Sequence, residues 1–296
     1  MSNVKLGINP LTWTNDDMPS LGAETPLETC LAESREAGFA GVELGNKFPR
    51  KAEVLKPILA EFDRELVSGW YSAELLTRSV EAEIEAVQDH LALLKACGCP
   101  VMVVCEVTDC IHGAMETPLT RRPVMAAEKW EEFGKRMTEF GDYLKEQGVH
   151  LAYHHHMGTV VQTEEEVNKL MEVTDPSVGL LLDTGHLTFA GGDPVRCAAK
   201  WGDRIVHVHT KDVRAEVLDD CLNRDLPFLK SVLQGVFTVP GDGSVDYNAV
   251  LAEMKKVDYH GWLVVEAEQD PAIAHPLTYA TMGYKNLKAI VDATGL

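Results

Sequence analysis

The sequence has few of the features that mark membrane-spanning, disulfide-bonded or nucleic-acid-binding proteins. Its apolar runs are short, and none approaches the roughly 20 residues that a membrane-spanning helix requires. Its seven cysteines are odd in number, irregularly spaced and match no zinc or thioredoxin motif, so free thiols in a reducing cytoplasm are expected. Basic residues are also scarce, because 27 Lys and Arg stand against 46 Asp and Glu, which gives a formal net charge of -19. This charge argues against nucleic-acid partners and against anionic membrane surfaces, since both would be repelled.

Further absences bear on domain organisation and location. Met1-Ser-Asn-Val-Lys5 leads directly into a strand-like run without a signal peptide, so a cytoplasmic protein is expected. No linker, low-complexity segment or short-period repeat divides the chain, and its 296 residues are expected to form one domain, 1–296. No Gly-x-Gly-x-x-Gly motif follows the first strand-like run, which disfavours an open dinucleotide-binding sheet.

The dominant pattern is an alternation of strand-like runs with amphipathic helical stretches, repeated eight times. Helix starts are expected at Thr25 with Pro26 as the first helical residue, at Ser79, and at Thr163, where Glu166 completes a capping box. Eight such units in 296 residues predict a closed (β/α)₈ TIM barrel, with an open doubly wound sheet as the alternative. The expected strands are 5–9, 41–45, 65–71, 101–106, 151–155, 178–183, 205–209 and 262–266. The expected helices are 25–37, 51–62, 79–97, 126–147, one starting at 163, one starting at 193, and 276–294.

Two connections are longer than barrel loops usually are. One covers 108–125, and the other covers 210–245 and reaches the run Val239-Pro-Gly-Asp-Gly-Ser-Val-Asp246. Both leave the carboxyl ends of strands, the side on which barrel active sites lie, so both are candidate lids. The alternative for each is a packed surface segment or a contact in a homo-oligomer.

Several strand-like runs end in residues that bind metals. Asp183, His209 and Glu266 each close an apolar run, and the run 151–156 ends in three histidines, of which His154 and His156 share one face of the strand. The carboxyl ends of parallel strands meet at one end of a barrel, so these side chains are expected to converge. Two carboxylates and two imidazoles without thiolates suit Mn²⁺, Co²⁺, Fe²⁺ or Zn²⁺ rather than a structural zinc. Either His154 or His156 can be the fourth ligand. A helix N-cap or a structural salt bridge is the alternative role for Asp183.

Residues beside these positions are candidates for other roles. His186 and Lys211 are expected to contact substrate, although Lys211 with Asp212 can equally form a local ion pair. His207 lies deeper on the strand of His209, where it can orient a ligand or be a satisfied core histidine. Glu268 shares the face of Glu266, and one of the two is expected to point into the site.

The ends of earlier strands offer further candidates. Glu43, Asn46 and Lys47 after the second strand, and Glu106 after the fourth, can supply a proton donor or a substrate contact. Trp13, Trp70, Tyr71 and Arg214 are candidates for the lining of the pocket, although an aromatic residue of this kind is more often part of a core.

The chain resembles, over nearly its whole length, the xylose-isomerase-like superfamily of sugar isomerases, epimerases and endonuclease IV. The resemblance lies in Asp183-Thr-Gly-His186, His207-Val-His209, the run ending at Asp246, and Glu266. Four local runs resemble, more narrowly, the inosose dehydratases of inositol degradation. They are Trp13-Thr-Asn-Asp-Asp17, Glu43-Leu-Gly-Asn-Lys-Phe-Pro49, Ser68-Gly-Trp-Tyr-Ser72 and Tyr153-His-His-His-Met-Gly-Thr159.

The resemblance implies a metal site of His154, Asp183, His209 and Glu266, with Mn²⁺ or Co²⁺ placed ahead of Zn²⁺ or Fe²⁺. His154 stands where relatives often have glutamate, and His156 keeps the substrate-facing position. This departure removes one member of the two-glutamate pair that epimerases use, which fits an elimination better.

The implied reaction is removal of water from 2-keto-myo-inositol to give a trihydroxycyclohexane-dione. The expected base is Glu266 or a histidine, and the general acid is Lys47, His156 or His186. A metal-dependent sugar isomerase or epimerase is the alternative, and a non-catalytic polyol sensor is a third interpretation. The charge of -19 disfavours an endonuclease.

Overall fold

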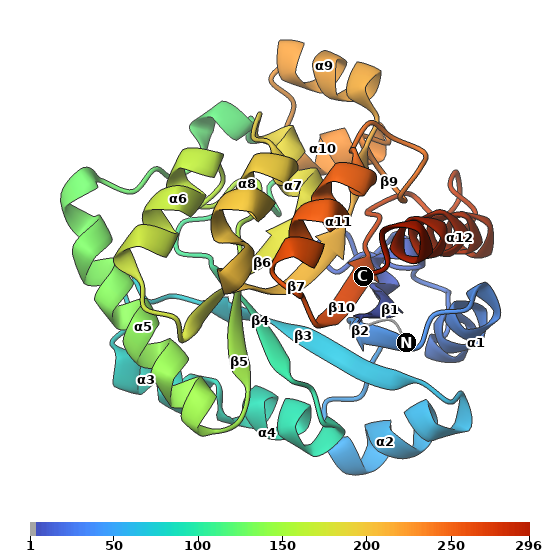
Figure 1. Ribbon diagram of the computed structural model, residues 1–296, viewed down its shortest axis with the longest axis horizontal. Coiled ribbons are helices and arrows are strands. Elements are labelled where there is room, and N and C mark those ends of the chain that lie inside the picture. The colour runs from blue at the N-terminus through green and yellow to red at the C-terminus, as the bar shows by residue number, and fades with distance from the viewer. Residues whose placement is uncertain (1–3) are drawn as a thin grey trace.

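The computed structural model describes residues 4–296, which build a closed barrel of eight parallel strands (Figure 1). The strands follow one another around the barrel in the order β1-β10-β7-β6-β5-β4-β3-β2, while β8 and β9 form a separate antiparallel pair. The predicted TIM barrel is therefore confirmed, and the open sheet is excluded. The barrel strands are β1 (Val4–Ile8), β2 (Gly41–Leu44), β3 (Glu65–Ala73), β4 (Val101–Glu106), β5 (His150–His154), β6 (Val178–Asp183), β7 (Ile205–Thr210) and β10 (Gly261–Val265).

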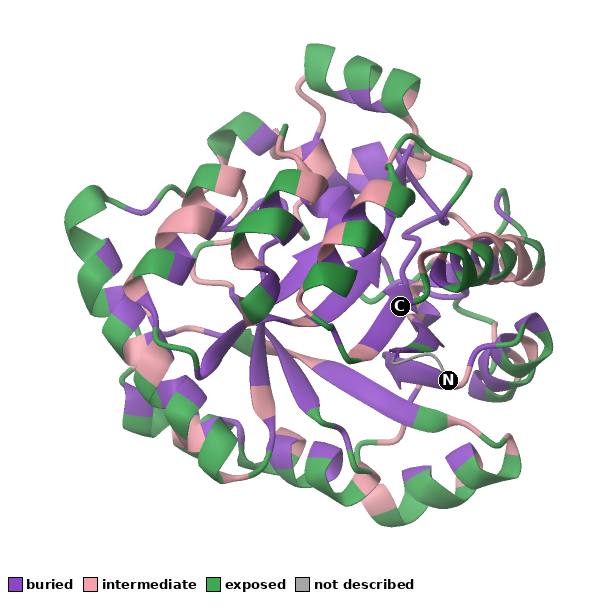
Figure 2. Ribbon diagram, viewed as in Figure 1, coloured by how far each residue is buried: buried purple, intermediate pink, exposed green. Residues whose placement is uncertain are grey.

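Helices form a ring around the outside of the strands (Figure 1). Figure 2 shows buried strands and helices whose outer faces are exposed, as amphipathic helices on a barrel require. None of the helices in residues 4–296 combines the length and the apolar character that crossing a lipid bilayer demands. The helices are α1 (Leu27–Ala37), α2 (Ala52–Glu61), α3 (Val80–Ala86), α4 (Gln88–Cys97), α5 (Trp130–Glu146), α6 (Glu164–Val173), α7 (Thr184–Phe189), α8 (Pro194–Trp201), α9 (Ala215–Asn223), α10 (Phe228–Leu233), α11 (Tyr247–Lys256) and α12 (Pro276–Thr294).

Strand alternation separates two cores and places the site above one of them. Alternate strand residues pack outward against the helices, in the large apolar cluster that includes Leu151, Tyr153 and Leu182. The residues between them point inward, where Ala152 and Leu181 belong to a small cluster in the barrel interior. Two residues further along the same inner face come the polar side chains at the carboxyl ends of the strands. Apolar packing thus closes the lower part of the barrel, and the polar groups gather at its carboxyl end.

Some local predictions are confirmed and others are wrong. The Thr163–Glu166 capping box is present, and Ser79 Oγ caps α3 by accepting from Ala82 N. The single helix expected over 79–97 is instead two helices, α3 and α4, which meet at Val87. Thr25 is not the cap of α1, because the helix begins at Leu27 and the preceding Pro26 is the N-cap.

The connection 210–245 is structured rather than a bare loop. It contains β8 (Asp212–Val213), α9, α10 and β9 (Phe237–Thr238), which lie beyond the carboxyl end of the barrel at the top of Figure 1. Phe228 and Phe237 anchor it in a second apolar cluster together with Met157 from the turn after β5. This packing favours the surface-segment interpretation of 210–245 over that of a mobile lid.

Candidate metal-binding active site

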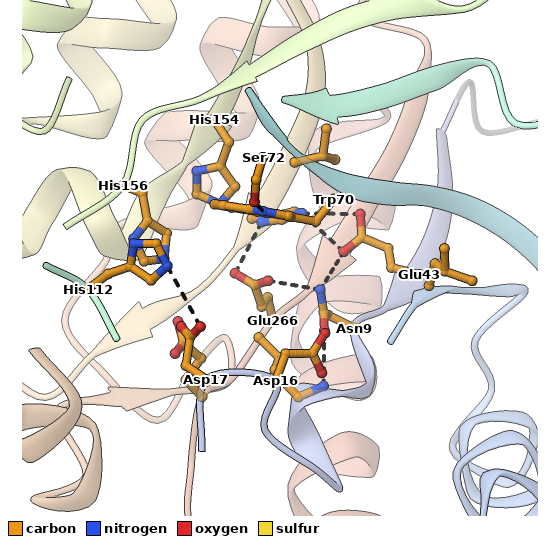
Figure 3. Close-up of a pocket in the computed structure, with 15 residues that line it drawn as sticks. Asn9, Asp16, Asp17, Glu43, Trp70, Ser72, His112, His154, His156 and Glu266 are labelled. Carbon is orange, nitrogen blue, oxygen red and sulfur yellow. Dashed lines mark hydrogen bonds and ion pairs between the residues drawn. The ribbon is translucent and has the colours of Figure 1, made fainter. Parts of the chain in front are cut away.

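A cavity of about 280 Å³ opens at the carboxyl end of the barrel, where the strand ends and two loops meet (Figure 3). Parallel strands in a closed barrel bring residues that are far apart in sequence to this one rim. Carboxylates and imidazoles dominate its walls. It is lined by Asn9, Leu11, Asp16, Asp17, Glu43, Leu44, Trp70, Ser72, Val103, His112, His154, His156, His209, Glu266 and Glu268.

Four predicted ligands converge at this end of the barrel. One ligand atom from each of His154, Asp183, His209 and Glu266 lies within 4.8 Å of the others, and all four residues are buried. His154 Nε2 is 3.6 Å from Asp183 Oδ2, and His209 Nδ1 is 3.5 Å from the same oxygen and 3.1 Å from Glu266 Oε2. Of the two histidines left open by the sequence, His154 therefore belongs to this cluster.

Hydrogen bonds fix the orientation of both imidazoles of the cluster. His154 Nδ1 is 2.7 Å from the carbonyl oxygen of His155, which can only accept, so Nδ1 carries the hydrogen and Nε2 has the free lone pair. His209 Nε2 is 3.2 Å from Glu43, so its Nδ1 is the nitrogen left to face Asp183 and Glu266. A ligand histidine usually donates its other ring hydrogen to a carbonyl or carboxylate in this way.

The cluster also holds surplus negative charge. Asp183 Oδ2, His209 Nδ1 and Glu266 Oε2 are buried and have no hydrogen bond of acceptable geometry to any part of residues 4–296. Burial opposes the charged form of His209, but Glu266 and Glu43 outweigh this effect and raise its pKa well above the ordinary value. Burial and the nearby His209 lower the pKa of His154, which keeps it neutral, as a ligand must be. Carboxylate oxygens without a well-formed hydrogen bond, a correctly oriented imidazole lone pair and an attraction for positive charge fit a divalent metal ion.

Asp183 serves two purposes at once. Its Oδ1 accepts a hydrogen bond of 2.7 Å from His186 N and caps α7, while Oδ2 faces the cluster. The helix-cap and metal-ligand interpretations of this residue are therefore compatible. The cap fixes the rotamer that directs the second oxygen toward His154 and His209.

Glu43 supports the cluster from the opposite strand. It accepts from Asn9 Nδ2 and from Ser68 Oγ, each at 2.6 Å, and it lies 2.8 Å from His207 Nε2. Glu43 also contacts His209, so His207 acts through Glu43 to orient that imidazole. Asn9 additionally donates to Glu266 Oε1 at 2.9 Å, which ties β1, β2 and β10 together at the site.

A second group of side chains lies beside the first and is built around a lysine. Ligand atoms of His156, His186 and Glu268 lie within 4.8 Å of one another. Lys211 is fully buried, and its Nζ is 3.0 Å from His186 Nε2, 2.7 Å from Glu268 Oε1 and 2.7 Å from Glu266 Oε2. Burial disfavours its charge, but Glu266 and Glu268 outweigh burial and raise its pKa. The ammonium group thus supplies the positive charge of this second group.

The structure places several predicted substrate contacts away from the cavity. Lys47 Nζ donates to the Ala23 carbonyl at 2.6 Å, so Lys47 is not available as the general acid. Trp13 is buried and its Nε1 donates to Glu33 at 2.6 Å. Arg214 is bound by the β8–β9 region, where it donates to the Gly235 carbonyl at 2.7 Å.

Other predicted positions have mixed outcomes. Trp70 and His156 line the cavity as expected, and both Glu266 and Glu268 do so, where only one was expected. His186 and Lys211 lie behind these carboxylates and are not part of the lining, and neither are Glu106, Asn46 and Tyr71.

Sequence reasoning missed several lining residues, most of them in loops and one, Ser72, in β3. Asn9, Asp16, Asp17, Ser72 and His112 all line the cavity, yet none was named as a site residue. Asn9 follows β1 directly, so its position at a strand end was a usable signal. His112 lies in the connection 108–125, and nothing in its local sequence indicates where that loop folds.

Comparisons with known proteins agree with this architecture. The model of the xylose isomerase-like TIM barrel family matches residues 31–289. The rhizopine catabolism protein MocC of Rhizobium meliloti is 50% identical over 295 residues, which cover 100% of this chain and 91% of that protein. Inosose dehydratase 2 of Bacillus cereus (strain ZK / E33L) is 47% identical over 297 residues, which cover 100% of this chain and 99% of the relative.

A solved structure of the IOLI protein with a bound zinc atom matches with a TM-score of 0.64 and 18% identity, covering 99% of this chain and 98% of that one. At this identity the likeness concerns the fold alone. Full-length relatives near half identity and the matching family model show that the chain belongs to the xylose isomerase-like TIM barrel family and, within it, to the group formed by the inosose dehydratases and MocC.

Proposed function

We propose that this protein is an inosose dehydratase, a hydro-lyase that removes water from 2-keto-myo-inositol and yields a trihydroxycyclohexane-dione. The observation that carries the proposal is the buried cluster of His154, Asp183, His209 and Glu266 at the carboxyl end of the barrel. Its setting in a chain that is 47% identical over its whole length to an inosose dehydratase supports this reaction over others of the superfamily. The cavity of about 280 Å³ is large enough for a six-membered polyol ring.

The four clustered residues would hold one divalent metal ion. Two imidazole nitrogens and two carboxylates suit Mn²⁺ or Co²⁺, and Zn²⁺, which the IOLI protein binds, and Fe²⁺ suit the same donors. When bound, such an ion supplies Lewis acidity that polarises the ketone and a neighbouring hydroxyl oxygen of the substrate. Glu43 and His207 keep His209 in the tautomer that this role requires.

His156 is placed to take the proton from the carbon next to the ketone. Its Nδ1 is 2.9 Å from the Met157 carbonyl oxygen and so carries the hydrogen, which leaves a basic lone pair on Nε2. Burial and the nearby His112 lower the pKa of His156, so the ring is neutral and able to accept a proton. As the C–H bond breaks, its electron pair forms the carbon–carbon double bond of the enediol.

Departure of the β-hydroxyl completes the elimination. The C–O bond breaks and the hydroxyl group takes up a proton to leave as water. Glu268 lines the cavity without belonging to the metal cluster, and burial raises its pKa to about 7, so its carboxyl group can carry a proton and is placed to give it. Asn9 holds Glu266 away from this role by donating to its Oε1. Loss of the β-hydroxyl uses the electron pair of the enediol double bond and leaves a new double bond one carbon further along the ring, so the immediate product is an enol of the dione, which then tautomerises to the dione.

The proposal is tested by incubating the purified, metal-replete protein with 2-keto-myo-inositol. An inosose dehydratase produces the dione, which is followed by its ultraviolet absorbance, and the product has lost one water by mass spectrometry. A sugar isomerase or epimerase gives a product of unchanged mass, and a non-catalytic polyol sensor gives no product. Chelation should abolish turnover, and adding back Mn²⁺, Co²⁺, Zn²⁺ or Fe²⁺ separately identifies the ion that restores it.

A further inference from the structure

We infer that Asp17 and His112 form a hydroxyl-reading clamp at the mouth of the cavity and are specificity-determining residues for a neutral, hydroxyl-rich ring. This inference rests on the proposed function and deepens it, because it names the groups that recognise the substrate on the side away from the metal ligands. Neither residue belongs to the metal cluster or to the proton-transfer groups described above.

The two side chains face each other across the mouth of the cavity. Asp17 comes from the loop after β1 and His112 from the loop after β4, and both line the cavity. His112 Nε2 is 3.7 Å from Asp17 Oδ1, which is close enough for attraction but too long for a hydrogen bond. Figure 3 shows the pair on the side of Glu266 opposite to Asn9 and Glu43.

Both groups retain their capacity to bind a ligand. Throughout residues 4–296, neither the carboxylate of Asp17 nor Nε2 of His112 has a hydrogen-bond partner, although the two groups lie 3.7 Å apart, and His112 Nδ1 is buried. The contact of 3.7 Å is longer than that of the buried Lys211 with Glu268, at 2.7 Å, so no direct hydrogen bond between Asp17 and His112 uses up their binding capacity. A substrate hydroxyl could donate to Asp17 and contact His112 at the same time.

The backbone under the clamp is built to hold it in place. Asn15 Oδ1 accepts from Asp17 N at 2.9 Å and from Met18 N at 2.7 Å, which fixes the turn that carries Asp17. Ile111 N donates to the Gly158 carbonyl at 2.9 Å, so the turn after β5 supports the residue next to His112.

Gly158 has a φ of +79°, and a Cβ there would lie 2.8 Å from His112 N. The ring of His112 packs edge-on against Trp70 and His156, with centroids 6.3 and 5.2 Å away. Groups held this firmly lose little freedom when a ligand binds, which favours specificity.

The charge of the cavity determines which ligands can reach the clamp. Its lining includes five carboxylates and no Lys or Arg among the described residues. Carboxylates accept hydrogen bonds from hydroxyl groups and repel phosphate or carboxylate groups. The clamp therefore selects uncharged polyols over sugar phosphates or acidic rings of the same size.

The experiment compares Asp17→Asn and His112→Gln with the parent, using 2-keto-myo-inositol and a series of its monodeoxy analogues. We expect each variant to lose about 10- to 100-fold in kcat/KM on the full substrate, as removal of one charge-assisted hydrogen bond predicts. Metal content should stay at the parent level. One monodeoxy analogue should lower the kcat/KM of the parent by a similar factor, because it lacks the hydroxyl group that the clamp binds. The kcat/KM of each variant should fall little further on that analogue than on the full substrate, and this identifies the hydroxyl group.

Two further variants separate recognition from general damage. His260→Gln removes another histidine that faces an aspartate, Asp258 at 3.9 Å, but on the exposed surface, and it should leave kcat/KM unchanged. Gly158→Ala should reproduce part of the His112→Gln effect, because the added methyl group displaces the backbone of His112. Parent-like kinetics in Asp17→Asn, or equal losses on every deoxy analogue, would overturn the clamp.

Calorimetric binding of unreactive myo-inositol to the metal-loaded protein distinguishes failure of the clamp from failure of the proposed function. If the parent does not turn over 2-keto-myo-inositol but binds myo-inositol more tightly than both variants do, the result supports the clamp and contradicts the dehydratase assignment. If the parent and both variants bind myo-inositol equally, or none binds it, the clamp is overturned whatever the turnover assay shows.

Discussion

Replacing Lys211 with methionine should strongly destabilise the protein, although methionine has a similar length and an apolar end. The Lys211 side chain is fully buried, and its Nζ lies 2.7 Å from both Glu266 and Glu268 and 3.7 Å from Asp183. Removing the ammonium group leaves His209 as the positive group beside Asp183 and Glu266, at 3.5 and 3.1 Å, and leaves the three carboxylates with one compensating charge fewer. The cost is therefore set by the unpaired charges that remain rather than by the lost contact itself.

The expected loss is about 3–5 kcal/mol in the free energy of unfolding, the usual cost of removing one partner from a buried ion pair. For a chain of this size that corresponds to a decrease in melting temperature of roughly 6–10 °C. A divalent ion at Asp183 and Glu266 would compensate two of the three carboxylates. The difference between variant and parent should therefore be smaller with metal than in the presence of a chelator.

Lys5→Met is the matched control. Lys5 Nζ also lies 2.7 Å from a carboxylate, that of Glu65, but the two side chains are 56% and 55% exposed. An exposed pair of this kind contributes about 0–1 kcal/mol, so the control should unfold close to the parent. Urea and thermal unfolding of the three proteins, each with and without metal, measure the contrast. Equal costs for Lys211→Met and Lys5→Met would refute the argument that burial, and not distance, sets the value of this interaction.

Three other outcomes are expected. His154→Ala should weaken metal affinity by at least about 10–100-fold in a calorimetric titration, and parent-like metal binding by this variant would contradict the geometry. His156→Ala should instead keep the metal and lose turnover, and His155→Ala should act mainly through packing. Glu266→Gln should lower the turnover rate by at least about 10² with the circular dichroism spectrum unchanged, and near-normal turnover in the metal-replete variant would exclude a role for this carboxylate. Chelation should lower the stability of the parent by about 2.7 kcal/mol relative to protein with metal at 100 times its Kd, and an unchanged melting temperature would argue against a bound ion.

The barrel could be predicted from the sequence because the hydrophobic periodicities of strands and helices are local properties of the chain. The limits of β4 and α12 agree with the predicted ranges, and the caps at Ser79 and Thr163 need only neighbouring backbone groups. The errors were local as well. No proline or glycine marks the break at Val87 between α3 and α4, so the sequence contains no local signal for it. At α1, Pro26 is compatible with the N-cap position as well as with the first turn of the helix.

The core of the site was predictable for a related reason. A residue that ends a buried parallel strand must lie at the carboxyl rim of the barrel, and alternation along the strand decides whether it points inward. Asp183, His209 and Glu266 meet both conditions, and the structure brings them together with His154. Alternation alone left His154 and His156 open, because it places both on the same face; the family resemblance favoured His154, and the structure places His154 in the cluster.

The sequence by itself determined the fold and the inward direction of these strand-end side chains, since both follow from hydrophobic period and strand polarity. Only the tertiary structure decided how loop residues are used. Lys47 and Arg214 bind carbonyl oxygens outside the cavity, whereas Asp17 and His112 come to face each other inside it. Loop paths depend on long-range contacts such as that of Ile111 with Gly158, and no local period encodes a contact between segments so far apart in the chain.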